Sequence, residues 1–260
     1  MDLQNTTALV TGASGGIGEE FAVQLAARGA NLVLVARRAD KLAELRARLL
    51  ERHPGRRVEV ITADLSVPGA AADLAGHMLG LGVGVDVLVN NAGVGSHGTF
   101  VDDTPDAVAA QIQLNCGSLA DLTARFLPAM QRNRRGLIIN VASTSAFQPV
   151  PTMAIYAATK AFVLSFTEAL WSENRRTGVR ILTLCPGPTE TAFFAGTGTQ
   201  FMTRGRHTPT QVVTAALSGV DSAAPTVIPG AANKVSSLGY RILPRRVMLR
   251  MAQQSVKPIT

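Results

Sequence analysis

The sequence lacks any apolar run long enough to cross a membrane. A membrane-spanning helix needs about 18 consecutive apolar residues, and no segment reaches that length. The N-terminal residues also lack the basic stretch and the apolar core of a secretory signal. We therefore expect a cytoplasmic protein without a membrane span.

Cysteine and histidine are scarce as well. The two cysteines, Cys116 and Cys185, lie far apart within apolar segments, which predicts buried free thiols in a reduced compartment rather than a disulfide. The four histidines show none of the spacings that hold a metal ion. The sequence therefore predicts no metal site.

Aromatic residues make up only 5% of the chain, too few for a base-stacking surface. The net charge of +7 would suit a polyanion, but the basic residues form short clusters without zinc-ligand spacing. We expect these residues, with the exception of Arg37, to be solvated at the surface. The sequence therefore predicts no nucleic-acid partner.

What the chain does have is enough apolar sequence for one large core, since 47% of its 260 residues are hydrophobic. Strand-like runs rich in Val, Leu and Ile alternate with helix-like runs, without a linker or repeat. This pattern predicts a single α/β domain over residues 1–260, a doubly wound parallel sheet flanked by helices on both faces. Residues 1–93 would form mainly the nucleotide half and residues 94–230 the catalytic half. Residues 190–208 would form a substrate loop and residues 231–260 a C-terminal tail.

The predicted strands cover residues 7–11, 31–36, 57–62, 85–90, 136–142, 179–184 and 225–228. The predicted helices cover residues 19–28, 40–52, 69–81, 105–132, 152–177 and 209–217. Ligands of such sheets lie beyond the carboxyl ends of the strands. Polar motifs stand at nearly every one of those ends, which predicts one common site.

The turn after the first strand carries Gly12, Gly16 and Gly18. Glycine lets the backbone approach a pyrophosphate, and the following helix N-terminus offers N–H groups and a positive dipole end. Because strand, turn and helix follow one another in the required order, we favour a dinucleotide site over an ordinary loop.

The second strand ends at Ala36–Arg37–Arg38. Sites that prefer NAD place a carboxylate here, whereas an arginine fork suits the 2′-phosphate of NADP(H). Ser14 would add a hydroxyl contact. Asp64 would accept from the adenine amino group, although capping of the next helix is an alternative for it. For Arg37 the alternative is a solvated residue at the start of a helix.

Tyr156 and Lys160 are four residues apart on a predicted helix and so share one face. We expect the ammonium to lower the Tyr156 pKa from its usual value near ~10. Ser143, at the end of a strand-like run, would reach a substrate oxygen opposite the phenol. Tyr-x-x-x-Lys alone is a weak signal, but its surroundings favour a proton-transfer site.

Together these motifs resemble the short-chain dehydrogenase/reductase family of the NADP-preferring type, over nearly the whole chain. The matching segments are Thr11–Gly18, Asp64–Leu65, Asn90–Gly93, Asn115, Ser143, Tyr156–Lys160 and Pro186–Thr191. The resemblance implies a Rossmann-like fold and hydride transfer between NADP(H) and a carbonyl or secondary alcohol. We also expect a homodimer or homotetramer.

The resemblance implies a catalytic tetrad. Tyr156 would be the general acid in reduction and the base in oxidation, and Ser143 would bond the reacting oxygen. Lys160 would bind the nicotinamide ribose and lower the Tyr156 pKa. Asn115 would hold a water that links Lys160 to solvent, although a bond to the backbone is also compatible with this residue.

The same resemblance assigns the cofactor contacts. They are Gly12, Ser14, Gly16, Ile17, Gly18, Arg37, Arg38, Asp64, Leu65, Asn91, Ala92, Gly93, Tyr156, Lys160, Pro186, Gly187, Thr189 and Thr191. Thr189 departs from the family, which more often has Val or Ile at this position, but a backbone contact would survive the change.

The residues that flank this site in the sequence are mainly apolar, which predicts a hydrophobic ketone or alcohol. They are His97, Phe147, Val150, Met153, Phe193, Phe194, Phe201 and Met202. We favour a loop role for His97 over that of a second acid. Steroid, polyketide, fatty-acyl and xenobiotic carbonyls all stay open as substrates.

The tail Leu238–Lys257 mixes Arg with apolar residues. It could lie on an anionic membrane, but Pro244 interrupts it, so we favour a helix packed over the pocket or a neighbouring subunit. The functional alternatives to a reductase are an idle cofactor sensor and a reductase of lipid ketones at a membrane surface. Epimerase or dehydratase chemistry would need a longer substrate domain.

Overall fold

The computed structural model describes residues 2–193, 205–222, 224–242 and 244–255. Of the predicted pocket residues, Phe194, Phe201 and Met202 lie outside the described residues. Within them, none of the helices combines the length and the apolar character needed to traverse a bilayer.

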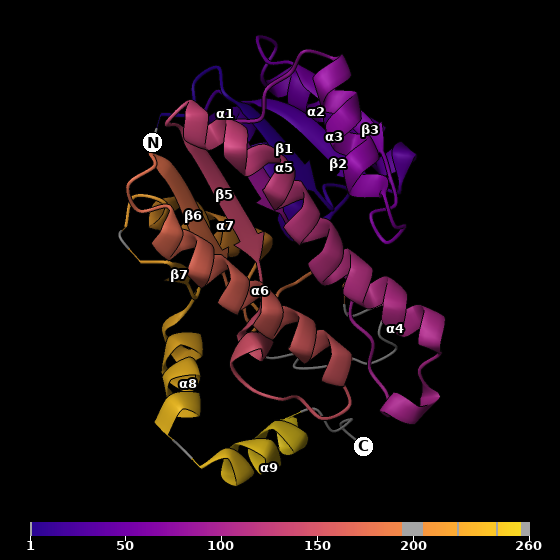
Figure 1. The fold of residues 1–260 in the computed structure, drawn as a ribbon, viewed down its shortest axis with the longest axis vertical. Coiled ribbons are helices and arrows are strands. Elements are labelled where there is room, and N and C mark those ends of the chain that lie inside the picture. Colours follow the sequence, from indigo (N-terminus) through magenta and orange to yellow (C-terminus); the bar gives the residue numbers. More distant parts are fainter. Residues whose placement is uncertain (1, 194–204, 223, 243, 256–260) are drawn as a thin grey trace.

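The fold is built on one parallel sheet of seven strands in the order β3-β2-β1-β4-β5-β6-β7 (Figure 1). The strands are β1 Thr7–Thr11, β2 Asn31–Ala36, β3 Val58–Thr62, β4 Val87–Asn90, β5 Gly136–Val141, β6 Val179–Leu184 and β7 Thr226–Val227. Their central members are buried runs of Val, Leu and Ile, as expected for a sheet covered on both faces. The predicted α/β fold is confirmed.

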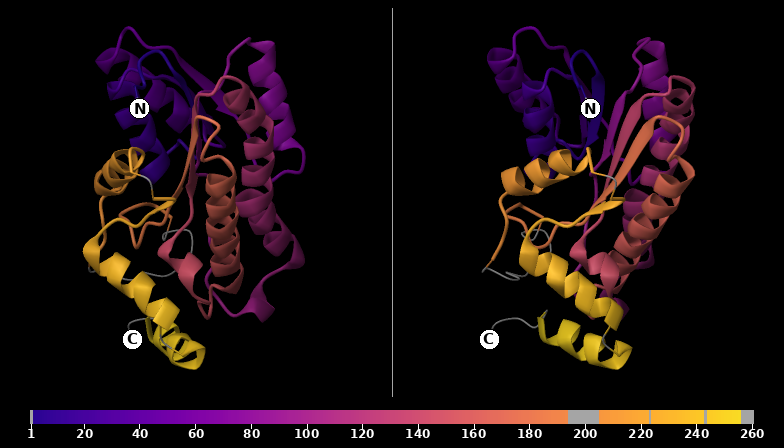
Figure 2. Two further views of the ribbon diagram at one scale, coloured as in Figure 1. Left: turned by 60° about the vertical axis from the view of Figure 1, so that its left-hand side comes forward. Right: turned by 90° about the vertical axis from the view of Figure 1, so that its left-hand side faces the viewer.

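Helices cover both faces of the sheet, and the last two helices of the chain lie outside these layers (Figures 1 and 2). The helices are α1 Gly16–Ala27, α2 Ala39–Arg52, α3 Ala70–Gly80, α4 Pro105–Ile112, α5 Ser118–Arg132, α6 Ala154–Glu173, α7 Pro209–Gly219, α8 Ala231–Ile242 and α9 Arg245–Ser255. α1, α2 and α7 contribute to one hydrophobic core, and α3 and α5 to the core on the opposite face. Alternate residues of each strand supply the two cores: Val10 packs on the first side and Leu9 on the second.

The predicted helix over residues 105–132 is wrong in one respect. It is interrupted by a π-helical turn at Gln113–Gly117, which separates α4 from α5. Asn115 lies in this turn and bonds to the neighbouring backbone. Its Oδ1 accepts from Val94 N at 3.0 Å, and its Nδ2 donates to Val94 O at 2.9 Å. A π-helical turn re-aims side chains and is frequent at functional sites.

Other boundaries differ by a few residues. α1 begins at Gly16 rather than at residue 19, and α6 begins at Ala154 and ends at Glu173. The C-terminal tail, predicted over residues 231–260 with a single helix favoured, forms two helices. Pro244 lies between them, directly before α9, where a proline needs no backbone donor. It therefore separates two helices instead of breaking one.

Candidate functional site

A cavity of about 730 Å³ lies at the carboxyl ends of the six strands β1 to β6. Its volume is typical of small-molecule sites, which span about 300–1,000 Å³. Most predicted site residues line it: Gly12, Ser14, Gly16, Ile17, Arg37, Arg38, Asp64, Leu65, Asn91, Ala92, Gly93, Ser143, Val150, Met153, Tyr156, Lys160, Pro186, Gly187, Thr189, Thr191 and Phe193. The fold therefore gathers residues from Gly12 to Phe193 around one space.

Four predicted residues do not line the cavity: Gly18, His97, Asn115 and Phe147. Gly18 lies behind the turn, against the carbonyl of Gly12. Phe147 packs with a separate apolar cluster instead of facing the cavity. Asn115 lies behind the cavity wall, where its amide bonds the backbone of Val94 and donates to Thr159 Oγ1 at 3.0 Å.

The glycine turn is shaped to admit a phosphate. Gly12 has a φ of +67°, and a Cβ at this position would lie 2.7 Å from Asn91 Nδ2, so only glycine fits. Asn91 in turn fixes the turn by donating to Thr11 O at 3.0 Å. Helix α1 follows directly, and no side chain caps its N-terminus at Gly15. Its first N–H groups are therefore available to an anion, as a dinucleotide pyrophosphate requires.

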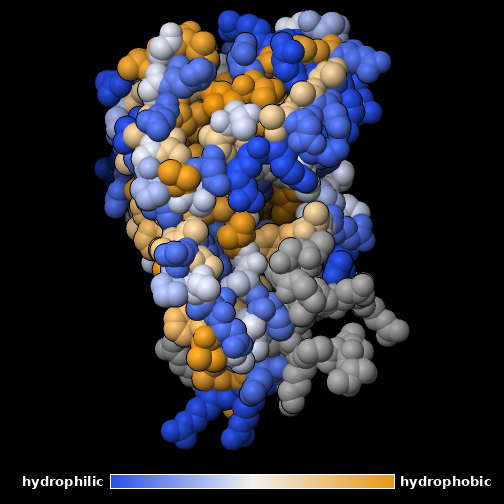
Figure 3. Space-filling model, turned by 90° about the vertical axis from the view of Figure 1, so that its right-hand side faces the viewer, coloured by the Kyte–Doolittle hydropathy of each residue, from blue (hydrophilic) through white to orange (hydrophobic). Residues whose placement is uncertain are grey.

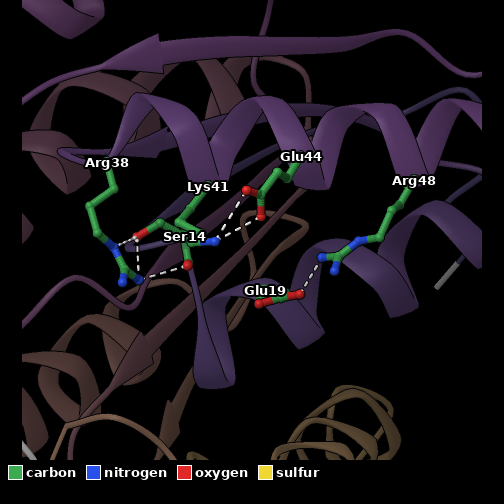
Figure 4. Close-up of polar contacts among 6 residues, drawn as sticks. All are labelled: Ser14, Glu19, Arg38, Lys41, Glu44 and Arg48. Atoms are coloured by element: carbon green, nitrogen blue, oxygen red, sulfur yellow. Dashed lines mark hydrogen bonds and ion pairs between the residues drawn. The ribbon is translucent and has the colours of Figure 1, made fainter.

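Two arginines stand at the end of β2 beside this turn. Arg38 Nη2 donates to Ser14 O at 2.7 Å, and Arg38 Nε donates to Ser14 Oγ at 3.3 Å (Figure 4). Arg37 Nη1 lies 3.7 Å from Asp64 Oδ2. Asp64 Oδ1 accepts from the backbone and hydroxyl of Ser66, so Asp64 bonds a turn rather than capping α3, which begins after Gly69. The hydrogen bond from the Ser66 hydroxyl lowers the pKa of Asp64, and the charge of Arg37 lowers it further by a smaller amount.

Tyr156 and Lys160 lie on α6 and are both buried, as is Ser143 at the end of β5. Lys160 Nζ lies 5.8 Å from the centre of the Tyr156 ring and donates to Val141 O at 2.8 Å. Burial raises the pKa of Tyr156 to about 12, while hydrogen bonding with Ser143 opposes the rise. Burial also lowers the pKa of Lys160 to about 8. The prediction that Lys160 lowers the pKa of Tyr156 is therefore wrong. Desolvation of the phenolate dominates and raises this pKa.

The two cysteines are free thiols close to Lys160. Cys185 is buried as predicted, but Cys116 is only half-buried, which corrects the prediction for it. Burial raises the pKa of Cys185 to about 12 and that of Cys116 to about 11. Both thiols are therefore uncharged at neutral pH and are poor nucleophiles.

An apolar wall faces Tyr156 at one end of the cavity. Val150 and Met153 form a buried cluster with Tyr156, and Phe193 packs against it with ring centres 5.4 Å from the Tyr156 ring. Gln148 also lines the cavity, and its buried Oε1 accepts no hydrogen bond within the described part of the chain. The arrangement fits a largely apolar substrate.

Helix α8 adds lining residues that the sequence motifs missed. Asn233 and Ser236 face the cavity, and Asn233 is anchored by donating to Pro229 O at 2.8 Å. The Asn233 side chain packs directly on Gly187, where a Cβ would lie 2.5 Å from Asn233 Nδ2. Thr144, Ser145 and Gln148 were missed too, although their position just after Ser143 was a usable signal.

Comparison with known proteins gives a consistent result. Residues 6–200 match the family model described as short chain dehydrogenase. A short-chain dehydrogenase from Sphingobium yanoikuyae, solved in complex with NADPH, is 32% identical with a TM-score of 0.83, and the match covers 98% of each chain. A bulky-bulky ketone specific alcohol dehydrogenase from Comamonas testosteroni is 31% identical with a TM-score of 0.79, covering 97% of this chain and 96% of that one.

A human relative, 17-beta-hydroxysteroid dehydrogenase type 3, is 36% identical over 202 residues. The match covers 76% of this chain but only 63% of the human protein. The chain therefore spans less than two thirds of that relative's length.

Proposed function

The chain belongs to the short-chain dehydrogenase family of oxidoreductases, and on that premise we propose that it is an NADP(H)-dependent carbonyl reductase or alcohol dehydrogenase. Its substrate would be a ketone or secondary alcohol with bulky apolar substituents. The observation that carries the proposal is that Ser143, Tyr156 and Lys160 line the same cavity as the glycine turn. A nicotinamide and a substrate oxygen can then meet beside one phenol.

Three features support NADP(H) as the cofactor. The end of β2 offers Arg37 and Arg38 and no carboxylate, Ser14 holds Arg38 beside the turn, and a relative of similar structure binds NADPH. An arginine fork matches the geometry of a phosphate, which NADP(H) carries on its ribose and NAD(H) does not. When bound, the reduced nicotinamide supplies the hydride.

We assign the remaining chemistry to four residues of the chain. Tyr156 holds a proton on Oη and donates it to the substrate oxygen. Ser143 Oγ bonds the same oxygen, so that two directed donors stabilise the growing negative charge. Lys160 places a cation beside the phenol, and Asn115 holds the backbone at Val94, which directly follows Gly93 beside Lys160.

A substrate screen tests the function directly. Purified protein with NADPH is offered ketones of increasing bulk, and oxidation of NADPH is followed by its absorbance. We expect turnover to favour ketones with apolar groups on both sides of the carbonyl. Tight NADPH binding without turnover of any ketone or alcohol would instead support the cofactor-sensor alternative.

The pKa of Tyr156 predicts opposite pH profiles for the two directions. With a pKa of about 12, the phenol keeps its proton at neutral pH, so the single-turnover rate of reduction should stay nearly constant from about pH 6 to 8. Oxidation needs the phenolate, so its rate should rise up to about tenfold per pH unit over the same range. Stopped-flow absorbance of NADPH measures both rates. A flat oxidation profile would show that the phenol is already ionised near neutrality.

A methyl group at Gly95 should disturb the apolar wall. The added Cβ of Gly95→Ala would lie 2.7 Å from Phe193 Cζ and 3.2 Å from Tyr156 Cδ2, so the Phe193 ring has to move. Overpacking of this kind costs about 1–3 kcal/mol, and we expect kcat/KM for bulky ketones to fall roughly tenfold. NADPH affinity, measured by fluorescence titration, should not change.

The double variant Gly95→Ala/Phe193→Leu serves as the control for this prediction. The shorter Leu side chain leaves room for the new methyl group, so most of the lost kcat/KM should return. If it does not return, the effect of Gly95→Ala comes from the backbone rather than from Phe193.

A further inference from the structure

The net charge of the protein comes almost entirely from its C-terminal segment. Asp221 is the last acidic residue of the sequence, and six Lys or Arg follow it. The first 221 residues hold 19 basic and 18 acidic residues, so they are nearly neutral. Residues 222–260 therefore form a cationic segment that follows a nearly neutral remainder of the chain.

The two helices of this segment expose large apolar side chains. On α8, Val235 and Leu238 are 70% and 59% exposed and lie one turn apart. On α9, Val247 and Leu249 are 42% and 38% exposed. These exposed side chains do not serve to attach the two helices to the protein, because each helix packs on it through another side. The residues buried on that side are Ser237 of α8 and Met248 and Ala252 of α9.

Basic residues flank the exposed apolar ones. Lys234 of α8 and Arg246 and Arg250 of α9 are exposed, next to Val235, Val247 and Leu249 in the sequence. Figures 1 and 2 place α8 and α9 at one end of the molecule, outside the layers that cover the sheet. Figure 3 shows strongly hydrophilic and hydrophobic side chains side by side at that end. We call the seven exposed residues the tail surface: Lys234, Val235, Leu238, Arg246, Val247, Leu249 and Arg250.

We propose that the tail surface docks on an anionic lipid membrane. Helices of this kind lie in the plane of the lipid headgroups, with apolar side chains at the acyl boundary and Lys or Arg on the anionic headgroups. The negative surface potential of the lipid attracts each cation, and no acidic side chain follows Asp221 to oppose it. Both the charge and the apolar side chains of the surface are then matched.

Other partners fit the tail surface less well. In a two-fold symmetric dimer the same surface meets itself, so the cations of one copy would face those of the other. A nucleic acid would neutralise the cations but would leave Val235 and Leu238 without an apolar partner. These two partners are the alternatives that the experiment has to separate.

Vesicle flotation of the full chain tests the proposal without any need for turnover. We expect the protein to float with vesicles in which about a third of the lipid is phosphatidylglycerol, and not with pure phosphatidylcholine. Raising the salt to about 0.5 M should release it, because the Debye length then falls well below 10 Å. Equal flotation with both lipids, or with neither, overturns the proposal.

Two variants separate charge from apolar contact. Lys234→Gln/Arg246→Gln/Arg250→Gln should weaken binding about a hundredfold, since each of the three cations contributes about fivefold. Val235→Ser/Leu238→Ser should weaken binding to the anionic vesicles as well. Circular dichroism shows whether each variant keeps its helices.

The matched control, Arg28→Gln/Arg52→Gln/Arg132→Gln, removes three exposed charges elsewhere on the surface and should bind vesicles within about twofold of the unchanged protein. If this control loses as much vesicle binding as the tail-surface charge variant, net charge alone drives binding, and the proposal is overturned. Binding of soluble heparin as tight as the binding of vesicles also overturns the proposal. The same holds if the tail-surface variants change the oligomeric state of the protein without changing its flotation.

Discussion

Tyr156→Phe should reduce the single-turnover rate of ketone reduction at least about a thousandfold. General acid catalysis contributes about 10²–10⁴-fold, and Tyr156 also supplies one of the two donors at the substrate oxygen. The variant removes only the hydroxyl, so the apolar contacts of the ring with Val150, Met153 and Phe193 remain. NADPH affinity should therefore stay within about threefold. Stopped-flow absorbance and fluorescence titration measure the two quantities.

The two serines after β5 provide a matched pair for this prediction. Ser143→Ala removes the second donor and should lower the rate about a hundredfold. Ser145→Ala removes a hydroxyl that also lines the cavity, but the Ser145 contact to Ser143 Oγ comes from its backbone N–H at 3.1 Å. The rate of this variant should remain within about threefold. Turnover that survives Tyr156→Phe would assign the acid to another group.

The fold and the position of the site could be predicted because both depend on local patterns. Short runs of Val, Leu and Ile in the sequence indicate buried strands, and a parallel sheet brings the carboxyl ends of these strands together. Gly12, Arg37 and Ser143 are far apart in the sequence, yet each stands just beyond such an end. Knowledge of the strands was therefore enough to place them in one cavity.

The features that were not predicted depend on three-dimensional packing. The π-helical turn at Gln113–Gly117 carries Asn115, whose side chain bonds the distant Val94 backbone, and no periodicity in the sequence reveals that contact. The lining by Asn233 and Ser236 depends on the packing of α8 against Gly187, which lies just beyond the end of β6. The rise in the Tyr156 pKa has the same origin, because spacing shows that Lys160 is near but not that both groups are removed from water.

Burial of Lys160 carries a functional consequence for the pair. With a pKa of about 8, the Lys160 ammonium is mostly charged at pH 7 but loses its proton within about one pH unit above that. Its contact with Val141 O satisfies one donor and leaves others for a ribose or a water. The position of Lys160 beside the phenol is therefore fixed by its bond to the Val141 carbonyl and by its place one turn after Tyr156 on α6.

Arg37→Asp should reverse the preference for NADPH over NADH. Loss of a charged hydrogen bond to the 2′-phosphate costs about 1.5–3 kcal/mol, and the new carboxylate adds repulsion, so NADPH affinity should fall at least about a hundredfold. The same carboxylate can accept from the 2′-hydroxyl of NADH, whose affinity should hold or rise. Fluorescence titration with both cofactors gives the ratio before and after the change.

Lys41→Asp is the control for this change, since it alters the charge by the same amount on the helix that follows Arg38. Lys41 pairs with Glu44 on the exposed side of α2 and does not line the cavity (Figure 4). Lys41 is exposed and makes no contact with the cavity, and salt at 0.1 M weakens the field of such exposed charges, so the cofactor ratio should move less than about threefold. An equal shift in both variants would mean that the general field of the protein selects the cofactor. A shift confined to Arg37→Asp means that the guanidinium does so by contact, with Arg38 already fixed on Ser14 beside it.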